Sequence, residues 1–177
     1  MKNISLLIIV AFICSSCEVK VDSGKKSSDE KLDSKAESTS NSKIRNDVQL
    51  NEKGLKVEQA FLIFRNDGSL VPADNKVGVG QEVGLRLIVK GWKEENGRVY
   101  PGTSEKVMTS DGAVLLDEPD LFNSYTDGVT AKDAEIITIT AVITKLDKLY
   151  DHFLVSFRVW DKKGDGEVSG SYKLYIK

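Results

Sequence analysis

Three acidic residues near the C-terminus have the type and spacing that a metal site would need. Asp161, Asp165 and Glu167 lie around a Lys-Gly-Asp-Gly segment at 163–166. Calcium takes about six to eight oxygen ligands, and carboxylates in a glycine-containing loop supply some of them. The spacing is not that of the EF-hand loop, so the alternative is a plain hairpin turn with solvated acids. We expect the hairpin, with calcium as the one cofactor these residues suggest.

Aromatic side chains form a second group suited to ligand binding. Four of them could make a flat platform for sugars: Trp92, Tyr100, Tyr125 and Trp160. The polar segment Lys93–Gly97 and the turn after Tyr100 mark this loop as the expected binding edge, because loops on rigid scaffolds carry function. The alternative is that Trp92 and Trp160 pack against the domain itself.

The residues for nucleophilic or acid–base catalysis are sparse. His152 is the single histidine, so a Ser-His-Asp arrangement would have to be built on it, and a histidine-rich zinc site is excluded. It follows Asp151 at the start of a strand pattern, where a hydrogen-bonded surface histidine is the common outcome. Paired carboxylates could hydrolyse glycosides, but 21 acids in residues 47–177 make chance pairs inevitable. We expect no enzymatic activity.

The N-terminal residues 1–16 have the layout of a secretory signal. Lys2 precedes the apolar run 6–13, and Ser15 and Ser16 stand before Cys17. The run is about half of the roughly 20 residues that a transmembrane helix needs. The segment resembles a lipobox, with Cys14 where that motif usually has leucine, as in the looser lipoboxes of Bacteroidetes lipoproteins. This resemblance implies that Cys17 is acylated and anchors the protein, which leaves no thiol in the mature domain.

Residues 17–46 are predicted to be a disordered polar tether. Residues 18–46 contain seven serines, seven basic and six acidic residues, with five scattered apolar ones. Such a composition buries too little apolar surface to fold. A flexible coil of this length spans roughly 30 Å. Because its charges nearly cancel, the lipid is the expected membrane contact, in the cell envelope and there in the outer membrane.

Residues 47–177 are predicted to form one all-β domain. Apolar and polar residues alternate with period two, and helical spacing is nearly absent. The clear strand segments are 61–64, 85–89, 137–143, 153–159 and 172–176, with weaker ones at 106–109 and 113–116. Glycine-containing turns separate them, and Thr130–Ala134 is expected to form one helical turn. About seven short strands indicate an antiparallel β-sandwich, with a small barrel as the alternative.

Two segments add a family resemblance to this pattern. Residues 153–165 resemble the last hairpin of bacterial immunoglobulin-like domains, in which an aromatic residue begins an alternating strand and a glycine turn follows. Residues 79–85 resemble the inner strand of the same domains. These domains usually have tyrosine where this chain has Phe153, so a tyrosine-corner hydrogen bond is lost or comes from Tyr150. The resemblance implies an immunoglobulin-like sandwich.

The expected function is that of a membrane-anchored, exported binding or interaction module. Residues 47–177 carry 17 basic and 21 acidic side chains, which argues against nucleic acid as a partner. The expected ligand is a protein or a glycan. The alternatives are a glycan-binding or hydrolase-accessory domain and a structural subunit of an envelope assembly.

Overall fold

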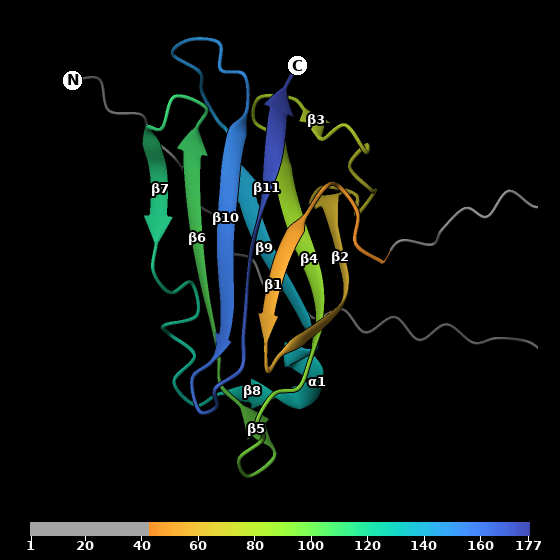
Figure 1. Ribbon diagram of the computed structural model, residues 1–177, viewed down its shortest axis with the longest axis vertical. Helices are drawn as coiled ribbons and strands as arrows, with labels where there is room; N and C mark the ends of the chain where they lie inside the picture. The colour runs from red at the N-terminus through yellow and green to blue at the C-terminus, as the bar shows by residue number, and fades with distance from the viewer. Residues whose placement is uncertain (1–42) are drawn as a thin grey trace, which may run out of the picture.

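The computed structural model describes residues 43–177, which form two β-sheets packed face to face (Figure 1). The predicted signal peptide, the predicted acylation site Cys17 and the predicted tether up to residue 42 lie outside the described residues. In chain order the elements are β1 (Gln49–Lys53), β2 (Lys56–Phe64), β3 (Lys76–Val77), β4 (Glu82–Lys90), β5 (Arg98–Val99), β6 (Pro101–Thr109), β7 (Val114–Glu118), β8 (Val129–Thr130), α1 (Ala131–Ala134), β9 (Ile136–Val142), β10 (Phe153–Asp161) and β11 (Glu167–Ile176).

The larger sheet has the order β1-β11-β10-β6-β7, and short β3 runs parallel to the end of β11. The smaller sheet has the order β2-β4-β9, and β5 pairs with β8 in a separate ribbon at the bottom of Figure 1. Except for β3, these strands pair antiparallel. The chain crosses between the sheets after β1, β4, β7 and β9, and between β2 and β4 it returns to the larger sheet at β3, while β6–β7 and β10–β11 are hairpins. This is an immunoglobulin-like sandwich, so the predicted fold class is confirmed.

The core lies between the sheets because each strand has one apolar face. On β10, Phe153, Val155, Phe157 and Val159 are buried, while the residues between them are partly or fully exposed. On β4, alternate residues from Val83 to Val89 face them from the smaller sheet. Each such side chain contributes about 1.5–3 kcal/mol of burial free energy. Packing, rather than any disulfide, therefore holds the described sandwich together.

The predicted helical turn is present as α1. The Thr130 backbone is extended, and its hydroxyl accepts a hydrogen bond from the Asp133 backbone N–H at 3.1 Å. The Thr130 hydroxyl in turn donates to the Asp133 carboxylate at 2.7 Å. This reciprocal cap satisfies a backbone donor that a helix start leaves open. It places α1 beside β9, at the lower end of the sandwich (Figure 1).

Two boundaries differ from the predictions. Strand β6 begins at Pro101, five residues before the predicted segment. The apolar alternation did not reveal this earlier start, because polar residues lie on the inner face of the strand. The predicted tether also overlaps the sandwich, since residues 43–46 pair with β2. The Arg45 N–H donates to the Ala60 carbonyl at 2.8 Å, and the Ala60 N–H donates to the Lys43 carbonyl at 3.0 Å. Backbone hydrogen bonds, which composition does not reveal, fix this entry.

Candidate functional site

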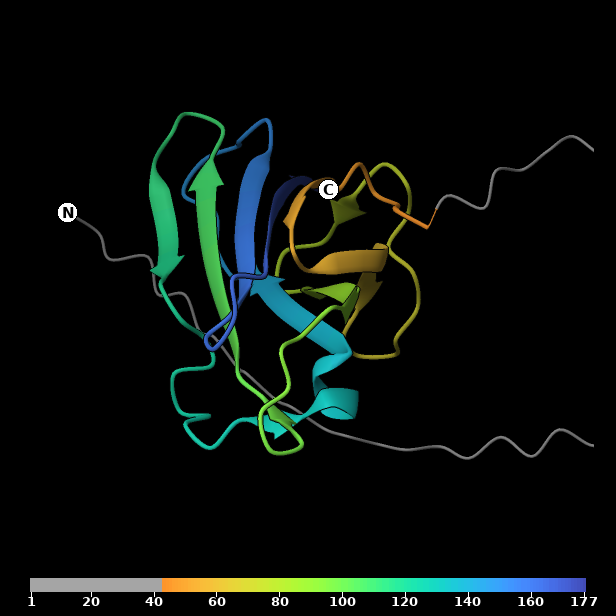
Figure 2. The same ribbon diagram turned by 60° about the horizontal axis from the view of Figure 1, so that its bottom comes forward.

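A groove of about 810 Å³ lies at the lower end of the sandwich, where three turns meet. The turns are those between β1 and β2, after β4, and between β10 and β11, and Figure 2 brings this end forward. Lysines, aspartates and glycines line the groove: Lys53, Gly54, Gly91, Lys93, Asp161, Lys162, Lys163, Gly164, Asp165 and Gly166.

Asp161 fixes the shape of this groove. Its side chain is buried, and its carboxylate accepts hydrogen bonds from the backbone N–H of Lys93 at 2.7 Å and of Lys163 at 2.9 Å. The hydrogen bond from Lys163 closes the β10–β11 turn. The hydrogen bond from Lys93 joins the segment after β4 to that turn. Hydrogen bonds to a charged group are worth more than neutral ones. The turns are therefore held together from inside the sandwich.

Glycines let the turns approach each other. A Cβ on Gly166 would lie 2.8 Å from the Cγ of Leu55, and a Cβ on Gly54, whose φ is +77°, would lie 3.0 Å from the Cα of Gly166. Both distances are shorter than normal carbon contacts, so side chains would push the two turns apart. The groove therefore has a preformed backbone floor with lysines around it.

The four lysines have different surroundings. Lys162 pairs with Asp120 at 2.7 Å, and the Lys93 ammonium donates to the Lys163 carbonyl at 3.0 Å. The Lys163 ammonium lies 5.2 Å from the ring centroid of Tyr100. Within residues 43–177, neither Lys53 nor Lys163 has an ion pair within 4.0 Å. Neither ammonium group thus forms a close ion pair among these residues, although the charge of Lys53, after the hydrogen bond from Arg158, helps to lower the pKa of Glu167.

The outer face of the larger sheet adjoins the groove through Lys53. The register places Lys53 opposite Glu167, Glu167 opposite Trp160, and Trp160 opposite Gly102. The Trp160 ring covers Gly102 so closely that a Cβ there would lie 2.1 Å from the ring. Arg158 pairs with Glu167 at 2.6 Å, and its guanidinium lies 4.8 Å from the Trp160 ring centroid. These contacts hold the ring at the edge of the sheet face.

Beyond Trp160 this face is covered by short polar side chains. Two neighbouring rows of the register place serine hydroxyl groups on three adjacent strands. We call these four residues the serine face: Ser104 on β6, Ser156 on β10, and Ser169 and Ser171 on β11. All four are partly exposed. Asn51 and Gln49 on β1 continue the same two rows. The result is a surface rich in hydroxyl and amide groups beside Trp160, in which Arg158 lies between Ser169 and Ser104, and Lys106 follows Ser156.

The predicted aromatic platform is assembled only in part. Trp160 lies on the outer face of the larger sheet. The Tyr100 ring lies under the ammonium group of Lys163, which belongs to the same β10–β11 hairpin as Trp160. Trp92 is instead half-buried against the core, and its Nε1 donates to the Ala134 carbonyl at 3.1 Å. The Tyr125 ring contacts Phe122 edge-on, with centroids 5.6 Å apart. Trp92 thus packs on the domain, and the Trp160 ring packs on Gly102 of the neighbouring strand β6, as the alternative held for both residues.

The three predicted calcium ligands do not converge. The Asp161 carboxylate serves backbone N–H groups, Glu167 pairs with Arg158, and Asp165 is exposed. Among residues 43–177, no three His, Cys, Asp or Glu side chains form a group able to hold a metal ion. The plain hairpin accounts for two of the acids without a metal, because Asp161 closes the turn and Glu167 pairs across the sheet, and Asp165 is solvent-exposed.

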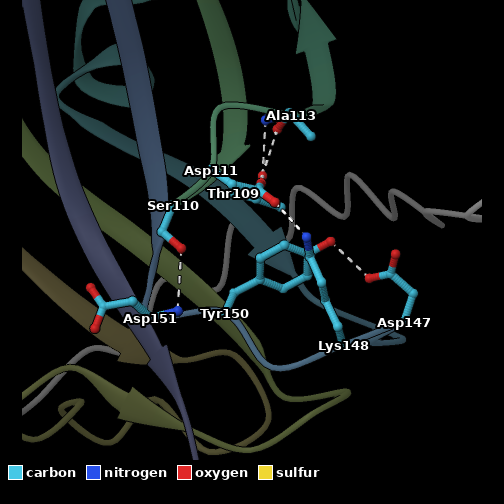
Figure 3. Close-up of polar contacts among 8 residues, drawn as sticks. All are labelled: Thr109, Ser110, Asp111, Ala113, Asp147, Lys148, Tyr150 and Asp151. Atoms are coloured by element: carbon cyan, nitrogen blue, oxygen red, sulfur yellow. Dashed lines mark hydrogen bonds and ion pairs between the residues drawn. The ribbon is translucent and has the colours of Figure 1, made fainter.

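His152 lies at the opposite end of the sandwich. Its Nδ1 is 2.7 Å from the Asp151 carboxylate. The Ser110 hydroxyl accepts from the Asp151 backbone N–H at 3.2 Å (Figure 3). The serine oxygen is thus oriented by a backbone amide rather than by an imidazole, unlike the nucleophile of a catalytic triad.

Figure 3 shows how the same end ties the β9–β10 loop to the β6–β7 turn. Lys148 pairs with Asp111 at 2.6 Å, and hydrogen bonds from Lys148 and Thr109 lower the pKa of Asp111 to about 2. The Tyr150 hydroxyl donates to the Asp147 carboxylate at 2.8 Å. Tyr150 therefore makes an upstream bond, although to a side chain and not to the backbone as in a tyrosine corner.

Glu105 is a buried acid that we did not predict. It lies on the inner face of β6 with 1% of its surface exposed, and burial raises the pKa of its carboxyl to about 8. Within the described structure, neither carboxyl oxygen has a hydrogen-bond partner, and the hydroxyl of buried Tyr172 has none either. The alternation Thr103, Glu105, Val107 was the available signal, because it places all three on one face.

Comparisons with known proteins give no family. No protein-family model matches the chain, and no curated protein matches it. Among solved structures, it is similar to the crystal structure of the C-terminal domain of wzt, with 13% identity, a TM-score of 0.47, and coverage of 75% of this chain and 80% of that chain. No helix within residues 43–177 is long and apolar enough to span a membrane. The fold assignment above rests on strand order and register.

Proposed function

We propose that this chain is an exported lipoprotein of the outer membrane whose sandwich domain binds a glycan without enzymatic activity. The observation that carries the ligand class is the serine face beside Trp160. Cys17 is the proposed site of the lipid. We assign no catalytic residue.

The chemistry of the serine face suits a polyhydroxylated ligand. A hydroxyl side chain both donates and accepts, and an amide side chain does the same through separate atoms. Sugars present alternating donors and acceptors, so rows of serines with Asn51 and Gln49 can match them at several angles. The short side chains on β1 and β11 give an extended ligand chain access to the sheet surface, and Arg158 and Lys106 lie beside it on β10 and β6.

Trp160 supplies the apolar part of such a site. An indole is a large, flat, amphipathic surface with few rotatable bonds, so it binds without a large loss of conformational entropy. Its packing on Gly102 and the neighbouring Arg158 fix its orientation before a ligand arrives. Preorganisation of this kind lowers the free-energy cost of binding.

A glycan array tests the ligand class. Full-length protein in detergent should bind a subset of glycans, and Trp160→Ala should reduce binding at least tenfold while the melting temperature stays near that of the wild type. Tyr125→Ala is the matched control, because Tyr125 is an exposed aromatic residue outside the serine face. Loss of binding in both variants, or none in the wild type, would count against the proposal.

Metabolic labelling tests the anchor. A labelled fatty acid should be incorporated into the wild-type chain and be absent from Cys17→Ser. Cys14→Leu is the control, because it moves the segment toward the usual lipobox and should keep the label. Retained label in Cys17→Ser would show that the lipid is attached at another residue and would overturn the proposed site. Crosslinking in intact cells would separate a glycan-binding role from that of a structural subunit, which should yield a stable protein partner.

A further inference from the structure

We infer that the groove at the lower end of the sandwich is an anion subsite, which takes a carboxylate or phosphate group of the glycan. This inference rests on the proposed function and adds to it the charge of the ligand. The groove and the serine face meet at Lys53, so one ligand can contact both.

Charge complementarity is the first argument. The groove is lined by four lysines and two aspartates, although the chain as a whole carries a formal net charge of −2. The Asp161 carboxylate is turned inward to two backbone N–H groups, which leaves Asp165 as the exposed acid of the lining. The lining is thus positive on a molecule whose overall balance is negative. Such local fields select ligands of opposite sign.

Two of the four lysine ammonium groups are available to a ligand. The Lys162 ammonium forms an ion pair with the Asp120 carboxylate, and the Lys93 Nζ lies 3.7 Å from the Glu95 Oε1. Lys53 and Lys163 have no ion-pair partner within 4.0 Å among residues 43–177. Glu167 lies opposite Lys53 on the neighbouring strand, but it is paired with Arg158. The two ammonium groups can therefore bind a ligand anion without first breaking an ion pair.

A ring contact and two hydrogen bonds restrict the conformation of the groove. Tyr100 lies beneath the Lys163 ammonium, which limits the conformations of a side chain that is otherwise flexible. The Asp161 carboxylate accepts hydrogen bonds from the backbone N–H groups of Lys93 and Lys163, which fixes the backbone at both lysines. An anion that enters the groove therefore meets a Lys163 ammonium whose conformations are already restricted, so less side-chain entropy is lost when this residue binds.

Equilibrium dialysis of the full-length protein in detergent tests the inference with three probes: galacturonate, galactose and inorganic phosphate. Galacturonate and phosphate should bind competitively, and galactose should not displace phosphate. Binding of the two anions should weaken as salt is added, because both lysines are exposed to solvent. The ratio of the two dissociation constants distinguishes the sources, because a carboxylate-bearing glycan predicts tighter binding of galacturonate and a phosphate-bearing glycan predicts tighter binding of phosphate.

Charge-matched variants locate the site. Lys53→Gln with Lys163→Gln should weaken phosphate binding by about tenfold or more, as expected for loss of two ligand contacts. Lys145→Gln with Lys177→Gln removes the same charge from residues outside the groove lining and should change binding less than about twofold. Equal weakening in both pairs would show a general charge effect and overturn the inference, as would a wild type that binds neither anion. Anion binding combined with a silent glycan array would keep the subsite and remove the proposed glycan.

Discussion

The side chains of Asn46 and Asn75 bind each other inside the sandwich and join three segments of the chain. Asn46 Nδ2 donates to Asn75 Oδ1 at 2.8 Å, and Asn75 Nδ2 donates to the carbonyl oxygens of Asn46 and Lys173, each at 2.9 Å. Asn46 Oδ1 accepts from the Leu62 N–H at 3.0 Å. Both residues have positive φ, 59° and 54°, which asparagine tolerates better than most residues. The entry of the chain is thereby joined to β2 and β11.

Removing either amide should destabilise the domain. Asn46→Gly and Asn75→Gly keep the positive φ accessible but leave buried backbone groups without partners, at a cost of about 2–3 kcal/mol each. Chemical denaturation of both single variants and the double variant should give a coupling free energy of about 1 kcal/mol or more. Asn96→Gly is the control, because Asn96 has φ 52° but is exposed. Strictly additive effects would show that the two amides act separately.

Glu105 should make stability depend on pH. Burial raises the pKa of its carboxyl from 4.5 to about 8, so the folded state holds a proton that the unfolded state has released. This stability is complete below pH 4.5 and is lost as the pH rises through 8, with a slope of about 1.4 kcal/mol per pH unit between these values. Glu105→Gln should flatten that slope in urea titrations at several pH values. Glu58→Gln, at an exposed position, should keep it.

The contact between Gly102 and Trp160 predicts an asymmetric mutational result. Gly102→Ala would place a Cβ 2.1 Å from the indole, so the ring must leave its position. We expect a loss of about 1–3 kcal/mol in stability and a shifted tryptophan emission. Adding Trp160→Ala to this variant should recover part of the stability, because the new methyl group then has room. Failure to recover would place the strain in the β6 backbone rather than in the ring contact.

Asp161 and Asp165 should respond differently to the same change. Asp161→Asn turns one buried acceptor into a donor that faces a backbone N–H, which costs about 2–4 kcal/mol. Asp165→Asn changes an exposed carboxylate and should alter stability by no more than about 0.5 kcal/mol. Hydrogen exchange at the Lys93 and Lys163 amides should accelerate in Asp161→Asn alone. Unchanged exchange at both amides would falsify the role of Asp161 in holding the groove.

The sequence by itself determined the inner and outer faces of the strands and the cap of α1. Period-two alternation along β10 and the threonine at Thr130 act over a few residues, so local pattern was sufficient to predict them. The signal-like N-terminus and Cys17 are likewise local features, and they support a prediction about location that lies outside the described fold. The boundary at residue 46 was wrong because its partner, Asn75, is distant in sequence.

Only the tertiary structure decided which residues share a site. Lys93 and Asp161 are 68 positions apart, and Lys53, Glu167, Trp160 and Gly102 form one row only because four strands pair in a particular register. Alternation fixes the face on which a side chain lies, but not its neighbours across the sheet. Those neighbours depend on how the strands cross between the two layers, which involves long-range contacts that no local pattern encodes. The groove and the serine face depend on these long-range pairings, whereas the inward face of Glu105 already follows from the alternation along β6.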